Sequence, residues 1–374
     1  MRTRLRLPLR SPLRSSRPVV ATTVAALALA AVALSGCTAS TEAPGGTQPV
    51  GRISLLLVRT SNIRYLAHDQ PHFTERMLQL CPRCTVDVQF AEQDAKKQAE
   101  QVKDALDHGT RVLVLNAVDP ANAGPLVTMA RERKVPVIAY DRLVSGAPLD
   151  YYVSFDNYNA GKLQGQALLD AVRARGDGEL LWVDGPASDV NAGAFAAGAH
   201  EILDGKVTVA AGFHPPGPGW TVGQVRTWLR ATLPTMRSRK IIGVYSPIDP
   251  VSAGVVAELQ AAGISPLPAV TGQDSDVAGL QRVMAGQQLM TLYKPFRLEA
   301  TKAAEVAFDL LRGRKPAADT TVDNKAGAVP SYLLQPVPVT RDTIKATVLK
   351  DGFVSTAALC AGDYADDCRA LGVG

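Results

Sequence analysis

The feature that most constrains the fold is an alternation of short apolar runs with longer amphipathic stretches, which begins at Arg52 and continues through most of the chain. The short runs are typical of buried strands, and the stretches between them are typical of helices with one apolar face. This order predicts an α/β protein whose parallel strands are covered by helices on both faces. About ten strands over about 280 residues are too many for one compact sheet, so we expect two similar sheets side by side. The break between them is expected near Phe155, Asp156 and Asn157.

The first 36 residues have the composition of an export signal. Six arginines lie between Arg2 and Arg17, and an uncharged apolar run of 16 residues follows from Val19 to Leu34. These are the charged and apolar regions of a signal peptide. A transmembrane helix needs about 20 apolar residues, so the run predicts a processed signal rather than a permanent span.

The apolar run ends in Leu34-Ser35-Gly36-Cys37, which resembles the bacterial lipobox. We therefore expect a lipoprotein signal peptide at residues 1–36, lipidation of Cys37, and attachment to the extracytoplasmic face of the cell membrane. Residues 37–49 are rich in Thr, Ser, Gly and Pro, and they predict a flexible tether. The alternative is an ordinary secretory signal with a coincidental cysteine.

Composition excludes several classes of protein. The chain is 46% apolar and 20% charged, which is typical of a soluble globular protein and not of disordered, collagenous or multi-pass membrane proteins. Without the first 36 residues, 34 basic residues face 35 acidic ones. This near neutrality gives no basic footprint for phosphate backbones, so no nucleic-acid partner is expected.

Four further cysteines are Cys81, Cys84, Cys360 and Cys368. In an exported protein they predict two disulfides, and among the three possible connectivities the short separations favour Cys81 with Cys84 and Cys360 with Cys368. A redox site at Cys81-Pro82-Arg83-Cys84 is the alternative, but this segment follows a predicted helix and precedes a strand, opposite to a thioredoxin-like motif.

Metal binding is not expected. His68 and His72 have the spacing of one helix face, but Pro71 indicates a loop that enters a helix, and no third ligand lies nearby in the sequence. We therefore expect solvated histidines.

Polar residues cluster where the expected strands end, and the carboxyl ends of parallel strands are where such sheets bind ligands. The residue types are mainly Asp, Asn, Gln and Arg, without a Ser-His-Asp set or a Gly-rich phosphate loop. Planar carboxylates, amides and guanidiniums can engage two adjacent hydroxyls at once, which suits a neutral polyol. The alternative for each residue is a helix cap or a turn. Neither catalysis nor a cofactor is expected.

Longer motifs carry a resemblance to a known family. The chain holds Val137-Ile138-Ala139-Tyr140-Asp141-Arg142-Leu143, Ser154-Phe155-Asp156-Asn157, Asp189-Val190-Asn191-Ala192, Ser246-Pro247-Ile248-Asp249, Thr271-Gly272-Gln273-Asp274-Ser275-Asp276, Tyr293-Lys294 and Pro330-Ser331-Tyr332-Leu333-Leu334-Gln335-Pro336. In order and spacing these resemble the periplasmic xylose-binding and multiple-sugar-binding proteins of bacterial ABC transporters. The resemblance covers nearly all of Ile53 to Phe353.

The resemblance implies a type I periplasmic-binding fold, in which two Rossmann-like domains joined by a three-strand hinge close over a monosaccharide. The N-terminal lobe would comprise residues 50–154 plus 293–326, and the C-terminal lobe residues 155–292 plus 327–374. A membrane permease would read the closed form, and a monomer is expected.

The resemblance also implies a set of sugar contacts. These are Arg64, Tyr65, Asp141, Arg142, Asn157, Asp189, Asn191, Trp220, Asp249, Asp274 and Lys294. Tyr65 stands where the family has Trp, and Val190 stands where the family usually has Asn, so the identity of the sugar stays open.

The sequence thus favours a lipid-anchored receptor that captures an aldose such as xylose, glucose, galactose or arabinose for an ABC-type permease. The alternative is a sensor that presents its closed form to a membrane receptor kinase or chemoreceptor. A repressor of the same fold would need a DNA-binding N-terminus in place of the signal. A glycosidase could use the carboxylates of Asp274 and Asp276, but one ligand and one helix cap explain this pair better.

Overall fold

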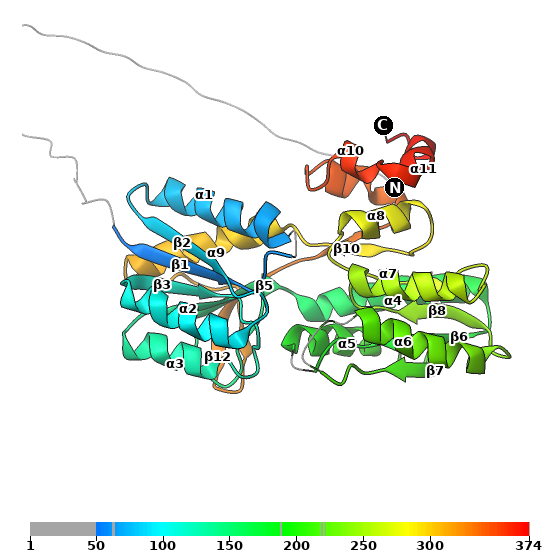
Figure 1. Ribbon diagram of the computed structural model, residues 1–374, viewed down its shortest axis with the longest axis horizontal. Helices are drawn as coiled ribbons and strands as arrows, with labels where there is room; N and C mark the ends of the chain where they lie inside the picture. Colours follow the sequence, from blue (N-terminus) through cyan, green and yellow to red (C-terminus); the bar gives the residue numbers. More distant parts are fainter. Residues whose placement is uncertain (1–49, 62–63, 188, 218–219, 221, 374) are drawn as a thin grey trace, which may run out of the picture. The chain divides into compact units, whose positions relative to one another are not determined.

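The structure, a computed structural model, describes residues 50–373 apart from 62–63, 188, 218–219 and 221 (Figure 1). The expected signal peptide at 1–36, the tether at 37–49 and the lipidation of Cys37 lie outside the described residues. In the part of the chain that is described, no helix combines the length and the apolar character needed to cross a membrane.

Strands and helices alternate along the chain. The strands are β1 (Arg52–Leu57), β2 (Thr85–Phe90), β3 (Thr110–Leu115), β4 (Val137–Tyr140), β5 (Tyr151–Phe155), β6 (Glu179–Val183), β7 (Thr208–Phe213), β8 (Ile241–Tyr245), β9 (Ala269–Val270), β10 (Thr291–Tyr293), β11 (Thr320–Asp323), β12 (Ala328–Leu334) and β13 (Val337–Val339). The helices are α1 (Gln70–Leu80), α2 (Ala95–Asp107), α3 (Gly124–Glu132), α4 (Asn157–Arg175), α5 (Val190–Leu203), α6 (Val222–Thr232), α7 (Asp249–Ala261), α8 (Val277–Met284), α9 (Phe296–Leu311), α10 (Thr356–Leu359) and α11 (Ala365–Ala370).

The larger sheet has seven strands in the order β11-β12-β5-β4-β3-β1-β2. All neighbouring strands are parallel except β11, which pairs with β12 in the antiparallel direction. Because the sheet is parallel, β1, β3, β4 and β5 all end at the same edge. Residues that follow these strands are therefore brought together.

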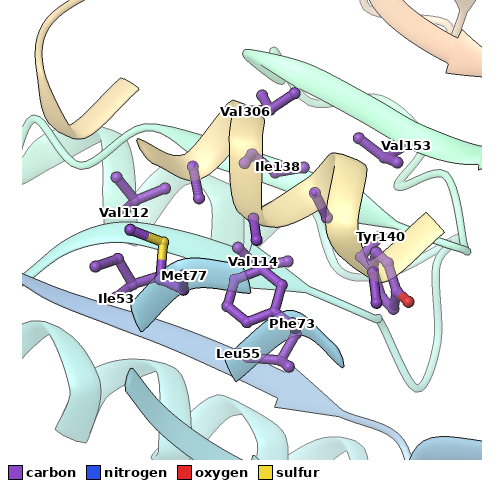
Figure 2. Close-up of a cluster of buried hydrophobic side chains, with 14 of the residues drawn as sticks. Ile53, Leu55, Phe73, Met77, Val112, Val114, Ile138, Tyr140, Val153 and Val306 are labelled. Atoms are coloured by element: carbon purple, nitrogen blue, oxygen red, sulfur yellow. The ribbon is translucent and has the colours of Figure 1, made fainter. Parts of the chain in front are cut away.

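Both faces of this sheet are buried, and the alternation of side chains along each strand explains how. Ile53 and Leu55 of β1 face the cluster that contains Phe73 and Met77 of α1, together with residues of α9 (Figure 2). Leu56 faces the opposite cluster, which contains residues of α2 and α3. The period of two along a strand sends successive side chains to opposite faces, so an apolar run fills both layers.

The smaller sheet has four parallel strands in the order β7-β6-β8-β9. Helices α4 and α5 cover one face of it, and α6 and α7 cover the other. Helices α4 and α5 can pack closely because Gly161 and Gly198 have no side chain. A β-carbon at either position would overlap the backbone of the facing helix. The two sheets agree with the predicted architecture.

A separate apolar cluster joins α8 to the C-terminal segment. Strands β10 and β13 form a short antiparallel pair, and apolar residues of α8 pack against residues 339–373. The Cys360–Cys368 disulfide lies in this segment, with a Cα–Cα distance of 5.7 Å. The Cys81–Cys84 disulfide, with a Cα–Cα distance of 5.4 Å, lies between α1 and β2 as the sequence order predicts.

The chain passes three times between the parts that contain the two sheets: after β5, after β10 and between β12 and β13. One expected boundary is wrong. Residues 327–374 do not all belong to the second lobe, because Ser331 to Leu334 of β12 pair with β5 in the seven-stranded sheet. Only the part of this segment that follows β12 packs with α8, because β13 pairs with β10 instead.

Candidate ligand-binding site

A small cavity lies where residues from the ends of both sheets meet. Its volume is about 90 Å³, and its lining consists of charged, amide and aromatic side chains with two apolar ones. The lining residues are Arg59, Arg64, Tyr65, Asp141, Arg142, Asp189, Asn191, Phe195, Trp220, Ile248, Pro250, Gln273, Asp274 and Lys294. Every predicted contact residue except Asn157 and Asp249 is therefore in the lining.

A buried charge cluster forms one side of the cavity. The Arg64 guanidinium donates to Asp69 from Nε and Nη2 at 3.1 Å each, to Asp141 from Nη1 at 3.1 Å, and to Glu299 from Nη2 at 2.6 Å. Phe296 covers the guanidinium, with its ring centre 4.0 Å from Cζ. We call Arg64, Asp69, Asp141 and Glu299 the Arg64 cluster.

The cluster places three carboxylates around one cation in a buried region. Burial raises the pKa of Glu299 well above its ordinary value, and the nearby Asp141 and Asp69 add to this although Arg64 opposes it. Burial also raises the pKa of Asp69. At Asp141 burial opposes ionisation, but Arg64, Lys294 and Arg142 together bring its pKa below the ordinary value. The cluster therefore favours ionisation of Asp141 and opposes ionisation of Asp69 and Glu299.

A left-handed backbone conformation places Asp141 at the end of β4. Its φ is +62°, which is uncommon for a residue with a side chain. Its carbonyl oxygen accepts hydrogen bonds from Ser154 Oγ at 2.9 Å and from Asn191 Nδ2 at 3.0 Å. Because Asn191 belongs to α5, this bond connects residues that pack on different sheets. The strained turn directs the next residue, Arg142, to the cavity.

Two backbone carbonyls that follow β3 hold Arg142 at the cavity wall. Its Nη1 donates to the carbonyl oxygens of Ala117 and Val118, both at 3.4 Å. Burial lowers the pKa of Arg142, but nearby Tyr65, Asp189 and Asp141 raise it above the ordinary value. The guanidinium therefore stays charged at the wall, where it can donate to ligand oxygens.

Asp189 combines both roles that the sequence allowed for it. It is the N-cap of α5, since one carboxylate oxygen accepts from the backbone N of Asn191 at 3.0 Å. The other oxygen accepts from Trp220 Nε1 at 3.0 Å. This bond fixes the indole beside the cavity, where Trp220 and Tyr65 supply aromatic surface.

Lys294 lies where the chain leaves β10, and it is 3% exposed. Its Nζ donates to Asn157 Oδ1 at 3.4 Å and lies 3.7 Å from a carboxylate oxygen of Asp274. Asn157 thus bonds to Lys294 and is not part of the cavity lining. A direct contact between Asn157 and a sugar stays a prediction.

Asp249 also differs from the prediction. It is fully buried, and its carboxylate accepts from Gln288 Nε2 at 2.7 Å and from Thr291 Oγ1 at 2.8 Å. Burial and nearby Asp276 raise its pKa well above the ordinary value. Its neighbours Ile248 and Pro250 line the cavity instead, so the first turn of α7 presents apolar atoms there while Asp249 points into the protein.

Five lining residues were missing from the predicted contact set: Arg59, Phe195, Ile248, Pro250 and Gln273. Gln273 is the most informative, since it is 1% exposed and its Oε1 has no hydrogen-bond partner among the described residues. A buried amide oxygen without a partner is costly, so a ligand donor is the natural complement. Its place after β9 was a usable signal, whereas no pattern in the sequence marks Phe195 of α5.

Asp276 and His68 have structural contacts near the cavity. Asp276 caps α8 by accepting from the backbone N of Gly279, as the helix-cap interpretation expected. His68 is only partly solvated, because its ring stacks on Phe353 with centroids 4.6 Å apart. Within the described ranges, no group of three or more His, Cys, Asp or Glu side chains is arranged to hold a metal ion.

The arrangement can bind a small, neutral, polar molecule. Charged donors at Arg142 and Lys294, acceptors at Asp189 and Gln273, and the rings of Tyr65 and Trp220 surround one cavity. Hydroxyl groups both donate and accept, and the apolar faces of a ring can lie on aromatic side chains.

Comparison with known proteins agrees with this geometry. Residues 54–315 match the periplasmic binding protein domain. The chain is 37% identical to the D-xylose-binding periplasmic protein of Escherichia coli (strain K12), over 71% of this chain and 80% of that protein. It is 33% identical to a multiple sugar-binding periplasmic protein of Azospirillum brasilense, over 72% of this chain and 81% of that protein.

Solved structures give the same result. A solute-binding protein of an ABC transporter from Clostridium phytofermentans, with bound β-D-glucose, superposes with a TM-score of 0.74 at 25% identity, covering 82% of this chain and 99% of that one. A carbohydrate transporter solute-binding protein from Chloroflexus aurantiacus, in complex with D-glucose, gives a TM-score of 0.73 at 26% identity, covering 82% and 97%. The predicted type I fold is confirmed. The chain belongs to the periplasmic binding protein family of ABC transporters, in the group that contains the D-xylose-binding and multiple-sugar-binding proteins.

Proposed function

We propose that this protein captures a monosaccharide, xylose or a similar aldose such as glucose, and delivers it to an ABC-type sugar permease without chemical change. The observation that carries the proposal is the cavity itself. Its lining combines the rings of Tyr65 and Trp220 with the polar side chains of Arg142, Asp189, Gln273 and Lys294. The names of the relatives support an aldose as the ligand.

The location of the cavity explains how capture could be signalled. Arg142 follows a strand of the larger sheet, whereas Asp189 and Gln273 follow strands of the smaller one. A sugar that bonds to both sides favours the closed arrangement, by at most the difference between its affinities for the closed and open forms. The permease then distinguishes the loaded protein by its closure.

Titration calorimetry tests capture. The chain that begins after Cys37 is unfolded, refolded to remove carried-over ligand, and titrated with D-xylose, D-glucose, D-galactose, L-arabinose, D-fucose and D-ribose. We expect one-to-one binding of at least one aldose at micromolar concentration, with a negative heat-capacity change because apolar surface is buried. No heat with any of these sugars would contradict the proposal.

We further propose that Cys37 carries the lipid that holds the protein at the extracytoplasmic face of the membrane. The supporting observation is the Leu34-Ser35-Gly36-Cys37 motif, which directly follows the apolar run from Val19 to Leu34. Replacement Cys37→Ala is expected to move the protein from the membrane fraction to the soluble one. Retention of this variant in the membrane would contradict lipidation.

Delivery is tested separately in cells. Deletion of the gene for this protein is expected to abolish high-affinity uptake of the sugar that calorimetry identifies, and the wild-type gene should restore uptake. Uptake that persists at full rate in the deletion strain would contradict delivery while leaving capture intact.

A further inference from the structure

A second and larger cavity adjoins the candidate sugar site. Its volume is about 460 Å³, compared with about 90 Å³ for the first. Arg59, Arg64, Pro250 and Asp274 line both cavities, so the two share part of their walls. A ligand that reaches past these side chains would enter the second cavity.

The apolar residues of the second lining come from five separate parts of the chain. Ala67 precedes α1, Phe296 begins α9, Pro250 and Val277 lie on α7 and α8, and Phe353, Val354 and Ala358 belong to the C-terminal segment. Val277 is 38% exposed. A free sugar carries hydroxyls around its whole edge, and these apolar residues offer no partners for them. The polar residues of the lining are Arg59, Ser61, Arg64, His68, Asp274, Ser275, Asp276 and Ser355.

His68 adds an uncharged ring to the same lining. It stacks on Phe353 and lies 6.0 Å from the Phe296 ring, between centroids. Burial lowers the pKa of His68 to about 4, with further lowering by His72 and Arg64. The imidazole is therefore neutral at neutral pH, and it presents no charge to an apolar group in the cavity.

One polar group of this lining lacks a partner. Ser275 is 1% exposed, and its Oγ has no hydrogen-bond partner among the described residues. Its backbone N is already bonded to Thr291 Oγ1 at 3.1 Å, and its φ is +53°. A buried hydroxyl of this kind favours a bound molecule that can accept or donate one hydrogen bond.

The C-terminal segment gives the cavity a fixed outer wall. Val354 and Leu359 are buried in the cluster with α8, and the Cys360–Cys368 disulfide closes the same segment. The wall next to Phe353 is thus held by packing and by a covalent bond, as an organised pocket requires.

We propose that the site accepts glycosides, with the sugar in the first cavity and an apolar aglycone of about the size of a phenyl ring in the second. This inference rests on the proposed capture of a sugar and extends it to the ligand class. Transfer of an apolar group from water to an apolar cavity is favourable, whereas a free monosaccharide leaves that cavity without a matching group.

Calorimetry with matched ligands tests the inference. The free aldose that binds most tightly is compared with its methyl and phenyl glycosides, each as the α and the β anomer. We expect one phenyl anomer to bind about tenfold more tightly than the corresponding methyl glycoside, a difference of about 1.4 kcal/mol. The methyl glycoside controls for loss of the anomeric hydroxyl.

Cavity-filling variants locate the aglycone. Val277→Phe and Ala358→Phe each place a ring in the second cavity and leave the first untouched. Both are expected to remove the tenfold gain of the phenyl glycoside and to keep the affinity of the methyl glycoside within about twofold. Val209→Phe, at an exposed position on β7, is the matched control and should change neither affinity.

The outcomes separate this inference from the proposed function. Binding of the free aldose with no gain for either phenyl anomer would overturn the inference and leave sugar capture intact. A gain that survives both filling variants, provided that these fold as judged by thermal unfolding, would place the aglycone elsewhere and also overturn it. Absence of binding by every free sugar would overturn the proposed function itself.

Discussion

The Arg64 cluster and the opposite wall of the cavity use similar side chains in different ways. In the cluster, the guanidinium of Arg64 is bonded to three carboxylates of the same protein. On the opposite wall, Gln273 keeps a buried oxygen without a partner among the described residues, and Asp274 lies 3.7 Å from Lys294 and is one-third exposed. The comparison teaches that a polar residue at a strand end is a candidate ligand contact where its side chain lines the cavity. A buried atom without a partner among the described residues, as at Gln273, strengthens that assignment.

The largest expected effect is on stability, in the cluster. Arg64→Ala leaves Asp69, Asp141 and Glu299 buried without their common cation, and we expect a loss of about 3–5 kcal/mol in the free energy of unfolding. Urea denaturation measures it. Arg76→Ala, which removes an ion pair with Glu305 at the surface of α1, is the control and should cost less than about 1 kcal/mol. Equal losses in the two variants would contradict the structural role of the cluster.

A wall residue should behave in the opposite way. Arg142→Ala removes a charged donor that makes two long bonds of 3.4 Å within the protein. We expect sugar affinity to fall by about 2 kcal/mol while the free energy of unfolding changes by less than about 1 kcal/mol. Calorimetry and urea denaturation of the same sample give both numbers. Unchanged affinity would remove Arg142 from the site.

The third prediction concerns pH. Because the pKa of Glu299 is raised in the folded protein, its contribution to stability is fully present below the unfolded pKa and is lost as pH rises through the folded pKa. Glu299→Gln keeps an acceptor for Arg64 but cannot ionise, so we expect the variant to be more stable than the parent by about 1 kcal/mol at pH 8. The advantage should shrink towards pH 4.

The control for this prediction is Glu75→Gln, since Glu75 has a side chain that is 65% exposed. Its urea denaturation curves should follow the parent at every pH. If Glu299→Gln instead lost stability at pH 8, the ionised form of Glu299 would stabilise the protein through Arg64. That result would contradict the claim that burial opposes ionisation of Glu299.

The smallest effect is expected at Asp249, which the family resemblance suggested as a contact. Because its carboxylate is bonded to Gln288 and Thr291 away from the cavity, Asp249→Asn should leave sugar affinity within about twofold. Asp274→Asn, at the cavity wall, is the matched variant and should weaken binding several-fold. A larger loss at Asp249 than at Asp274 would reverse this assignment.

Much of the fold was predictable because apolar runs record burial. Strands β1, β3 and β4 are buried on both faces, so their runs are continuous and easily recognised. Strand β12 was not expected, since Pro330 lies within it and proline removes a hydrogen-bond donor from a sheet. Its antiparallel partner β11 is mostly exposed and has no apolar run to mark it.

The site was predictable where the end of a strand determines the position of a residue. It was less predictable where the side-chain rotamer determines whether the residue faces the cavity. Asp141, Arg142 and Asp274 follow strands and line the cavity as expected. Asp249 and Gln273 also follow strands, but one points into the protein and the other to the cavity, because Gln288 and Thr291 are available to bond Asp249. Such partners come from distant parts of the chain, and no local pattern records them.

The most direct test of this division is a crystal structure of the protein with its aldose bound. The division between cluster and wall predicts sugar hydroxyls within hydrogen-bond distance of Arg142, Asp189 and Gln273, with Asp69, Glu299 and Asp249 bonded only within the protein. Sugar hydroxyls bonded to Asp249 or Glu299, with Gln273 left without a partner, would contradict it.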